Sequence, residues 1–129
     1  MRVALLAALA AHNLGLALHS SGASSQAQPF VARAYSHFEQ ALGTEHWRTL
    51  HVVHSLGMLA AAQDALEEAL RLFSTAASGR VAALGPDALD TYRSIVAHGS
   101  TLCALARFAD ADAVLAPAAA RAARVLGAE

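Results

Sequence analysis

Long apolar stretches alternate with short polar breaks along the chain, and the spacing within the stretches is that of helices. In the centre, residues 46–62 contain no helix breaker except Gly57, and a second stretch covers residues 65–83. The polar pair at 63–64 separates them. Leu-Gly-Pro-Asp at 84–87 ends the second stretch, because a glycine after the last helical residue with proline next is a termination signal. The pattern predicts two helices joined by a short turn.

This helix pair is repeated along the chain. Six of the eight glycines fall into two columns with a period of 42 residues. The columns are Gly15, Gly57, Gly99 and Gly43, Gly85, Gly127. The period divides the chain into units at about 1–41, 42–83 and 84–125, with the start of a truncated fourth unit at 126–129. The sequence therefore predicts three helix pairs, or about six helices.

The first helix of each unit carries two different stripes. In the middle unit the aliphatic stripe consists of Val53, Leu56, Gly57 and Ala60. A glycine within a helix costs about 1 kcal/mol of helix propensity. Its recurrence in every unit predicts a close approach of the partner helix, with the small residue Ala69 as the expected contact. The second stripe is more polar and lies about 200° around the helix, so it is expected to face something other than the core. In the middle unit this polar stripe consists of His51, His54, Ser55 and Met58.

The repeated positions resemble a known family. The middle unit reads Val53-x2-Leu56-Gly57-x2-Ala60 and then Ala69-x3-Phe73. This is similar to the tetratricopeptide repeat pattern W-x2-L-G-x2-Y…A-x3-F. The 42-residue unit beginning Leu-Gly-Pro-Asp resembles the kinesin-light-chain variety. The resemblance implies an all-α, right-handed α-solenoid of three helix-turn-helix repeats, forming a single domain over residues 1–129.

The resemblance also implies a binding groove. In this family the first helices line a concave groove that holds an extended peptide or a partner helix. The matching positions are His12, Asn13, Leu16, His51, His54, Ser55, Met58, Arg93, Val96 and Ser100. We expect the histidines and Arg93 to be accessible to solvent in one row. Such a groove should prefer acidic or neutral peptides, and the histidines should titrate near pH 6–6.5.

Composition narrows the class of protein. Alanine supplies 34 of the 129 residues, and the strand-forming residues are few, so an all-β fold is excluded. The chain has no lysine and a net charge of −1. No basic face has the density of a nucleic-acid-binding protein. We therefore expect protein or peptide partners and no nucleic acid.

Few residues have the types and spacing of a metal site, a catalytic nucleophile or a cofactor-binding motif. His51 and His54 have a spacing that can share a metal, but no cysteine or carboxylate stands at ligand spacing beside them. Cys103 lies in an apolar helix and is expected to be a small buried thiol. No phosphate-binding loop, dinucleotide-binding motif or nucleophile elbow occurs. We expect no metal, no cofactor and no enzymatic activity.

The N-terminus permits two interpretations. Arg2 followed by an apolar run looks like the start of a secretory signal peptide. However, Leu14, Gly15 and Ala27 keep the phase of the later units, which favours a helix of the folded domain. We expect a cytoplasmic protein without a membrane segment.

The sequence thus predicts a protein-protein interaction module. The alternative is a fragment of a larger signalling protein, in which the repeats form a regulatory or sensor segment next to a nucleotide-binding switch domain. Because solenoid ends need polar caps, self-association through the uncapped ends is also expected.

Overall fold

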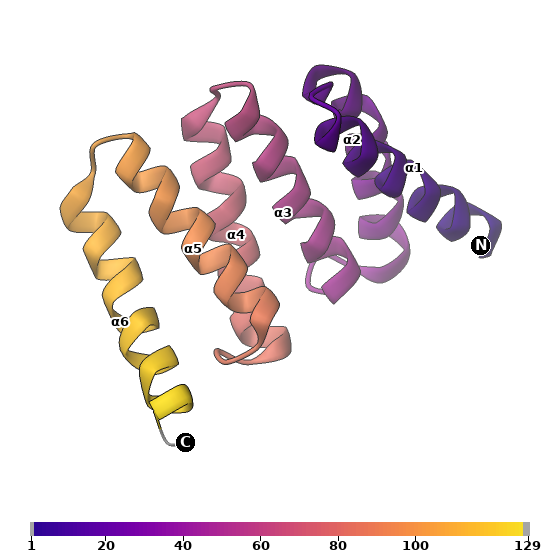
Figure 1. The fold of residues 1–129 in the computed structure, drawn as a ribbon. Coiled ribbons are helices and arrows are strands. Elements are labelled where there is room, and N and C mark those ends of the chain that lie inside the picture. Colours follow the sequence, from indigo (N-terminus) through magenta and orange to yellow (C-terminus); the bar gives the residue numbers. More distant parts are fainter. Residues whose placement is uncertain (1, 128–129) are drawn as a thin grey trace.

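A computed structural model describes residues 2–127 and contains six α-helices. The helices are α1 Arg2–Ser20, α2 Ser24–Leu42, α3 Trp47–Ala62, α4 Leu66–Leu84, α5 Leu89–Ala104 and α6 Phe108–Gly127. No strand occurs in this part of the chain. Each helix packs on the next, so the chain forms a row with its two ends far apart (Figure 1). This is the predicted all-α helical repeat array.

Glycine ends the second helices of the first two units, as the sequence predicts. Gly43 follows α2 and Gly85 follows α4, and both have φ of +89°. This left-handed conformation is costly for residues with a Cβ atom. The predicted fourth unit begins at Leu126 and Gly127, which are the last residues of α6, whereas residues 128–129 lie outside the described part, as does Met1.

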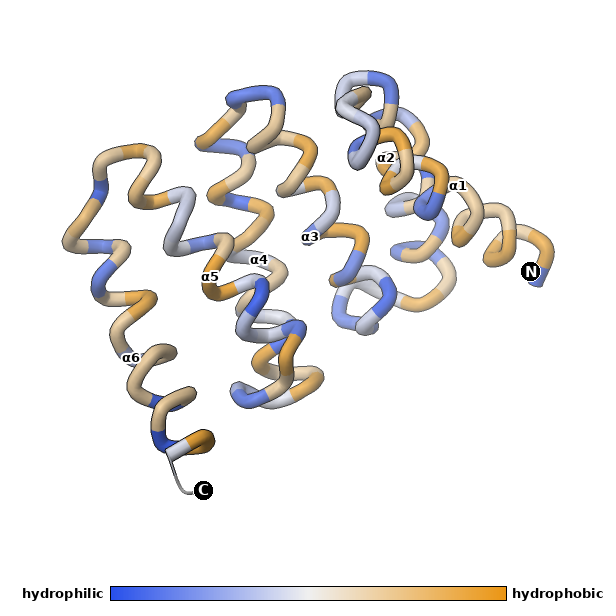
Figure 2. The backbone as a smooth tube through the Cα atoms, viewed as in Figure 1, coloured by the Kyte–Doolittle hydropathy of each residue, from blue (hydrophilic) through white to orange (hydrophobic). Residues whose placement is uncertain are grey.

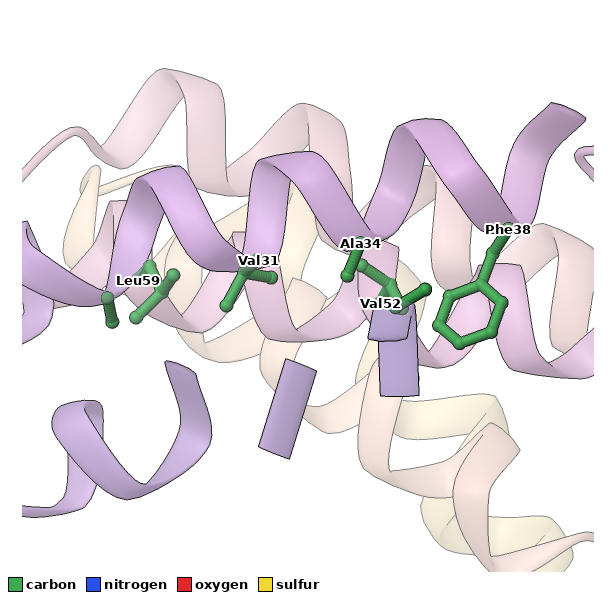
Figure 3. Packing of buried hydrophobic residues seen from close by; sticks show 7 residues of the cluster. Val31, Ala34, Phe38, Val52 and Leu59 are labelled. Carbon is green, nitrogen blue, oxygen red and sulfur yellow. The ribbon is translucent and has the colours of Figure 1, made fainter. Parts of the chain in front are cut away.

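Two apolar clusters hold the row together. The first joins α1, α2 and α3 and includes Val31, Phe38, Val52 and Leu59 (Figure 3). The second joins α3 and α4 and is centred on Phe73, with Ala97 of α5 packed against it. Because each cluster spans successive helix pairs, the first helices are held in a fixed register with one another.

The glycine of each first helix makes room for a large side chain. A Cβ atom on Gly57 would come within 2.7 Å of Cε1 of Phe73, and the nearest neighbours of Gly15 and Gly99 are Val31 and Leu115. The close approach is as predicted. In the first unit the expected alanine column takes part, since the carbonyl of Ala27 lies 3.4 Å from a Cβ built on Gly15, whereas at Gly57 the three nearest atoms all belong to the Phe73 ring.

The outer helices are covered on one side only. In α6 only Ala111 is buried, and in α1 only Ala8, His12 and Gly15 are. Apolar positions dominate the N-terminal half of α1 (Figure 2). Among the described residues, α1 is the one helix whose length and composition would suffice to cross a membrane. In this fold it packs along α2 and also contacts α3.

Candidate functional site

Histidines of the polar stripe join the first helices, α1 to α3 and α3 to α5. His12 of α1 bonds to Ser55 of α3 at 2.8 Å, and His54 of α3 bonds to Ser94 of α5 at 2.9 Å. We call the surface formed by the polar stripes of these three helices the first-helix face. These two hydrogen bonds connect the three helices beneath this surface.

The hydrogen bonds around His12 define its tautomer. The Ser55 hydroxyl donates to the carbonyl of His51 at 3.1 Å. Its oxygen therefore accepts the hydrogen bond from Nε2 of His12, which must carry the proton. The His12 ring also meets the His51 ring edge to face, with centroids 4.9 Å apart. His12 is only 3% exposed, so it belongs to the packing between α1 and α3.

The hydrogen bonds around His54 differ from those of His12, because its bonded nitrogen is Nδ1 and not Nε2. Nη1 of Arg80 donates to the Ser94 hydroxyl at 3.0 Å. Among the described residues, Nδ1 of His54 is the one acceptor bonded to the Ser94 hydroxyl, so this assignment has the hydroxyl donate its proton to Nδ1. The His54 proton then sits on Nε2, where it is a free donor. His54 cannot copy the bond of His12, because the repeat position of Ser55 is occupied by Ala97 in the next unit.

Burial keeps these imidazoles neutral. Burial, together with the neighbouring His51, lowers the pKa of His12 to about 4. Burial also lowers the pKa of His54 to about 4, assisted by the positive charge of Arg80. The pKa of His51 is lowered by the same two causes. For His12 and His54 the expected titration near pH 6–6.5 is therefore wrong, because desolvation disfavours the imidazolium form.

The structure divides the predicted groove residues into three groups. Exposed residues are Asn13, His51, Arg93, Val96 and Ser100. Half-buried residues are Leu16, His54 and Met58. Buried residues are His12 and Ser55. The prediction that His12 continues an exposed row is wrong, because α3 covers it, and Ser55 is fully buried by the same contact.

Arg80 is a site residue that the sequence reasoning missed. It lies on α4 but reaches α5, where Nη1 contacts the carbonyl of Asp90 and the hydroxyl of Ser94, both at 3.0 Å. Arg80 is 2% exposed, and no carboxylate of the described residues lies within 4.0 Å of it. The 42-residue period could have predicted the burial of Arg80, since Arg80 occupies the position of the aromatic residue Phe38 in the first unit.

An apolar hollow of about 350 Å³ adjoins this region one unit earlier. Its lining comes from α1, α2 and the start of α3, and includes Leu9, which stands at the repeat position of His51. The lining residues are Arg2, Leu5, Leu6, Leu9, Phe38, Leu42, His46 and Arg48. The hollow can hold an apolar side chain, and Arg2, His46 and Arg48 add polar groups to its lining.

The described residues were also compared with the requirements of a metal site and of a reactive cysteine. No group of three or more histidine, cysteine, aspartate or glutamate side chains is placed to hold a metal there. Cys103 is exposed, so the expectation of a buried thiol is wrong. It lies in the last turn of α5, where the neighbouring Thr101 and Leu102 take the buried positions.

Comparison with known proteins identifies the central unit. Residues 49–87 match the family model described as tetratricopeptide repeat. The match covers α3, the following turn, α4 and the Leu-Gly-Pro-Asp turn. A search of curated proteins finds no match to the chain.

Proposed function

Because the chain is a repeat protein of the tetratricopeptide type, we propose that it binds a peptide or a helix of a partner protein along the first-helix face. Repeats of this type generally mediate protein-protein interaction, and the family is a non-catalytic interaction module. The finer proposal concerns the surface: the partner lies across α1, α3 and α5 and contacts their exposed polar-stripe residues.

One observation carries this proposal. The first-helix face combines polar groups that lack partners within the fold with apolar surface that lacks cover. Nε2 of His54 is a donor without a partner in the described residues, and Val96 is 52% exposed one helix away. The apolar hollow, lined from α1, α2 and the start of α3, adds uncovered apolar surface one unit earlier. A surface with both kinds of unsatisfied group fits a peptide, which supplies backbone hydrogen bonds and side chains together.

A peptide selection tests the proposal. The whole chain is immobilised and challenged with a displayed library of random peptides of about 12 residues, which span about 40 Å when extended. Selected peptides are then measured in solution against Val96→Arg, which blocks the face with a long cation. The matched control is Ala82→Arg, at an exposed position of the second helix α4.

We expect Val96→Arg to weaken binding by about tenfold or more, and Ala82→Arg to leave it within about twofold. Equal affinity of both variants and the parent chain would show that the peptides bind elsewhere. Failure to select any specific peptide would count against peptide recognition altogether.

The repeat subtype, an alternative role and the cellular location go beyond what the family match supports. The 42-residue period supports the kinesin-light-chain-like subtype. The alternative role, a regulatory or sensor segment next to a nucleotide-binding switch domain of a larger signalling protein, stays a prediction. A cytoplasmic location stays a prediction as well.

The open outer helices support self-association as an additional proposal. Val3, Leu6 and Leu14 of α1 are 78%, 65% and 46% exposed, and Leu126 of α6 is 65% exposed. Apolar surface at the open ends of a solenoid lacks the cover that a further unit or a polar cap would give it. Contact between an open α1 and an open α6 of two copies would bury both surfaces.

A further inference from the structure

The apolar hollow of the first unit has its polar groups at one end. Arg2 begins α1, His46 caps α3, and Arg48 lies in the first turn of α3. Because successive helices run in opposite directions, these helix ends lie on the same side of the row (Figure 1). Leu9 and Phe38 line the hollow one to two turns further along their helices. The hollow therefore has a polar end and an apolar end.

The apolar end offers room for a hydrocarbon chain. Leu5 and Leu9 of α1 are half-buried in its lining, and Phe38 is 2% exposed. Leu6 also lines the hollow and is 65% exposed, so part of the apolar lining faces solvent. The volume of about 350 Å³ suffices for about ten methylene groups, since a group of this size occupies roughly 30 Å³ in a liquid.

The cations of the polar end have no acidic partner among the described residues. No ion pair in that part of the chain includes Arg2 or Arg48. The nearest acids in sequence, Glu39 and Glu45, do not line the hollow. The Arg48 guanidinium lies over the Trp47 ring, 4.6 Å from its centroid. Stacking occupies the face of the guanidinium and leaves its N–H edge for an acceptor.

His46 adds a second donor to the polar end. Its Nδ1 accepts a hydrogen bond from the backbone N–H of Arg48 at 3.1 Å. The proton of the neutral ring is therefore on Nε2, and Nε2 bonds to no other described residue. The side-chain groups left at this end are all donors, which is the arrangement that an anion requires.

We propose that this hollow binds one monomeric fatty acid of about ten carbons. Its chain lies against Leu5, Leu9 and Phe38, and its carboxylate accepts hydrogen bonds from Arg48 and Nε2 of His46. Binding sites for small ligands are mostly apolar with a few convergent polar groups, and a carboxylate matches the planar fork of a guanidinium. This inference does not depend on peptide binding by the first-helix face.

Trp47 supplies the signal for the first experiment, because it is the only tryptophan of the chain and lies between His46 and Arg48. The whole chain is titrated with saturated fatty acids of six to fourteen carbons, below their micelle concentrations. We expect saturation at one ligand per chain. Affinity should rise roughly three- to fourfold per methylene up to decanoate and by less beyond it, because further carbons leave the hollow. A constant gain up to fourteen carbons would show adsorption on open apolar surface and overturn the site.

The head group is tested with decyltrimethylammonium, which has a chain of the same length and the opposite charge. It should bind at least about tenfold more weakly than decanoate at ~0.1 M salt. Arg48→Gln should reduce this difference severalfold. Arg33→Gln, at an exposed position of α2 outside the hollow, should retain it. Calorimetry measures the variants, because Arg48→Gln also changes the surroundings of Trp47. Equal affinity of the parent chain for both amphiphiles, or an unchanged difference in Arg48→Gln, would overturn the carboxylate position.

The chain position is tested by filling the hollow. Leu9→Phe should weaken decanoate binding by about tenfold and shift the preferred chain length to eight carbons or fewer. Ala17→Phe adds the same ring at an exposed position of α1 outside the hollow and should change neither quantity. Equal decanoate affinity of Leu9→Phe and the parent chain would overturn the site. The head-group comparison needs no variant and holds if Leu9→Phe fails to fold.

Vesicles separate a free fatty acid from a lipid surface, since α1 has the length and composition of a membrane-crossing helix. The chain should stay in solution when vesicles of phosphatidylcholine and phosphatidylglycerol are sedimented. Co-sedimentation would assign the apolar lining to a lipid surface and overturn the fatty-acid site. None of these results bears on peptide binding, which fails if the Val96→Arg variant binds the selected peptides as well as the parent chain.

Discussion

Arg80 donates a hydrogen bond to Ser94 at 3.0 Å, at the place where the preceding unit packs Phe38 beside Val52. The two interfaces between units therefore use the same backbone positions with opposite chemistry (Figure 3 shows the apolar pair). In both, the second-helix residue is 2% exposed. The polar version stabilises less per buried side chain, because the guanidinium loses hydration, but it creates a charged position in an otherwise alanine-rich solenoid.

A double-mutant cycle on Arg80 and Ser94 tests whether an apolar pair can replace this polar pair. Ser94→Val alone should lower the free energy of unfolding by about 1–3 kcal/mol, because it leaves Arg80 and Nδ1 of His54 without their shared partner. Adding Arg80→Phe should restore the parent stability or exceed it. Urea denaturation of the parent, the two single variants and the double variant measures the coupling. A double variant less stable than Ser94→Val would refute the equivalence of the two interfaces.

The close contact at Gly57 gives a second prediction. Gly57→Leu should destabilise the fold by about 3 kcal/mol or more, since its side chain would enter the space of the Phe73 ring. Gly127→Ala is the control, because no atom lies within 4 Å of a Cβ built at Gly127. That change should leave the thermal midpoint unchanged or raise it slightly. Similar midpoints for both variants would remove the packing role assigned to the glycine column.

The glycine columns were sufficient to predict the helix pairs, because helix ends and close contacts depend on local sequence. Gly43 and Gly85 end helices, and Gly57 sets a distance to its own partner helix. The depth of a side chain between neighbouring units depends instead on how the units are stacked. His12 and His54 share a repeat position, yet His12 is buried and bonded to Ser55 whereas His54 is half-buried and bonded to Ser94.

The same distinction explains why Arg80 was missed. An arginine in an otherwise exposed-looking helix is normally read as a surface residue, and only comparison with Phe38 shows that its position is a core position. Cys103 shows the opposite error. Its apolar neighbours suggested burial, but the helix turns it away from the core. Composition around a residue is a weaker guide than its position in the repeat.

Self-association can be tested at the exposed end of α1. Leu6→Glu should reduce the sedimentation coefficient at high protein concentration, because it places a charge on the open apolar surface of the first helix. Leu89→Glu is the matched control: both leucines are 65% exposed, but Leu89 lies on α5 within the array. If the parent chain sediments as a monomer at every concentration, the open ends do not associate. If Leu89→Glu has the same effect as Leu6→Glu, the contact is not through α1.

Acid should destabilise the fold through its neutral histidines. Burial lowers the pKa of His12 and His54 to about 4, whereas an unfolded histidine titrates near 6.5. Between these values the unfolded chain binds protons that the folded chain does not, so stability falls as the pH is lowered from 6.5 to 4. Each histidine contributes a slope of up to about 1.4 kcal/mol per pH unit.

His12→Gln and His54→Gln keep a donor or acceptor for the serine but cannot titrate. Urea denaturation across this range should show a reduced slope in each single variant and the smallest in the double variant. An unchanged slope in the double variant would show that both rings bind protons in the folded state as readily as in the unfolded chain.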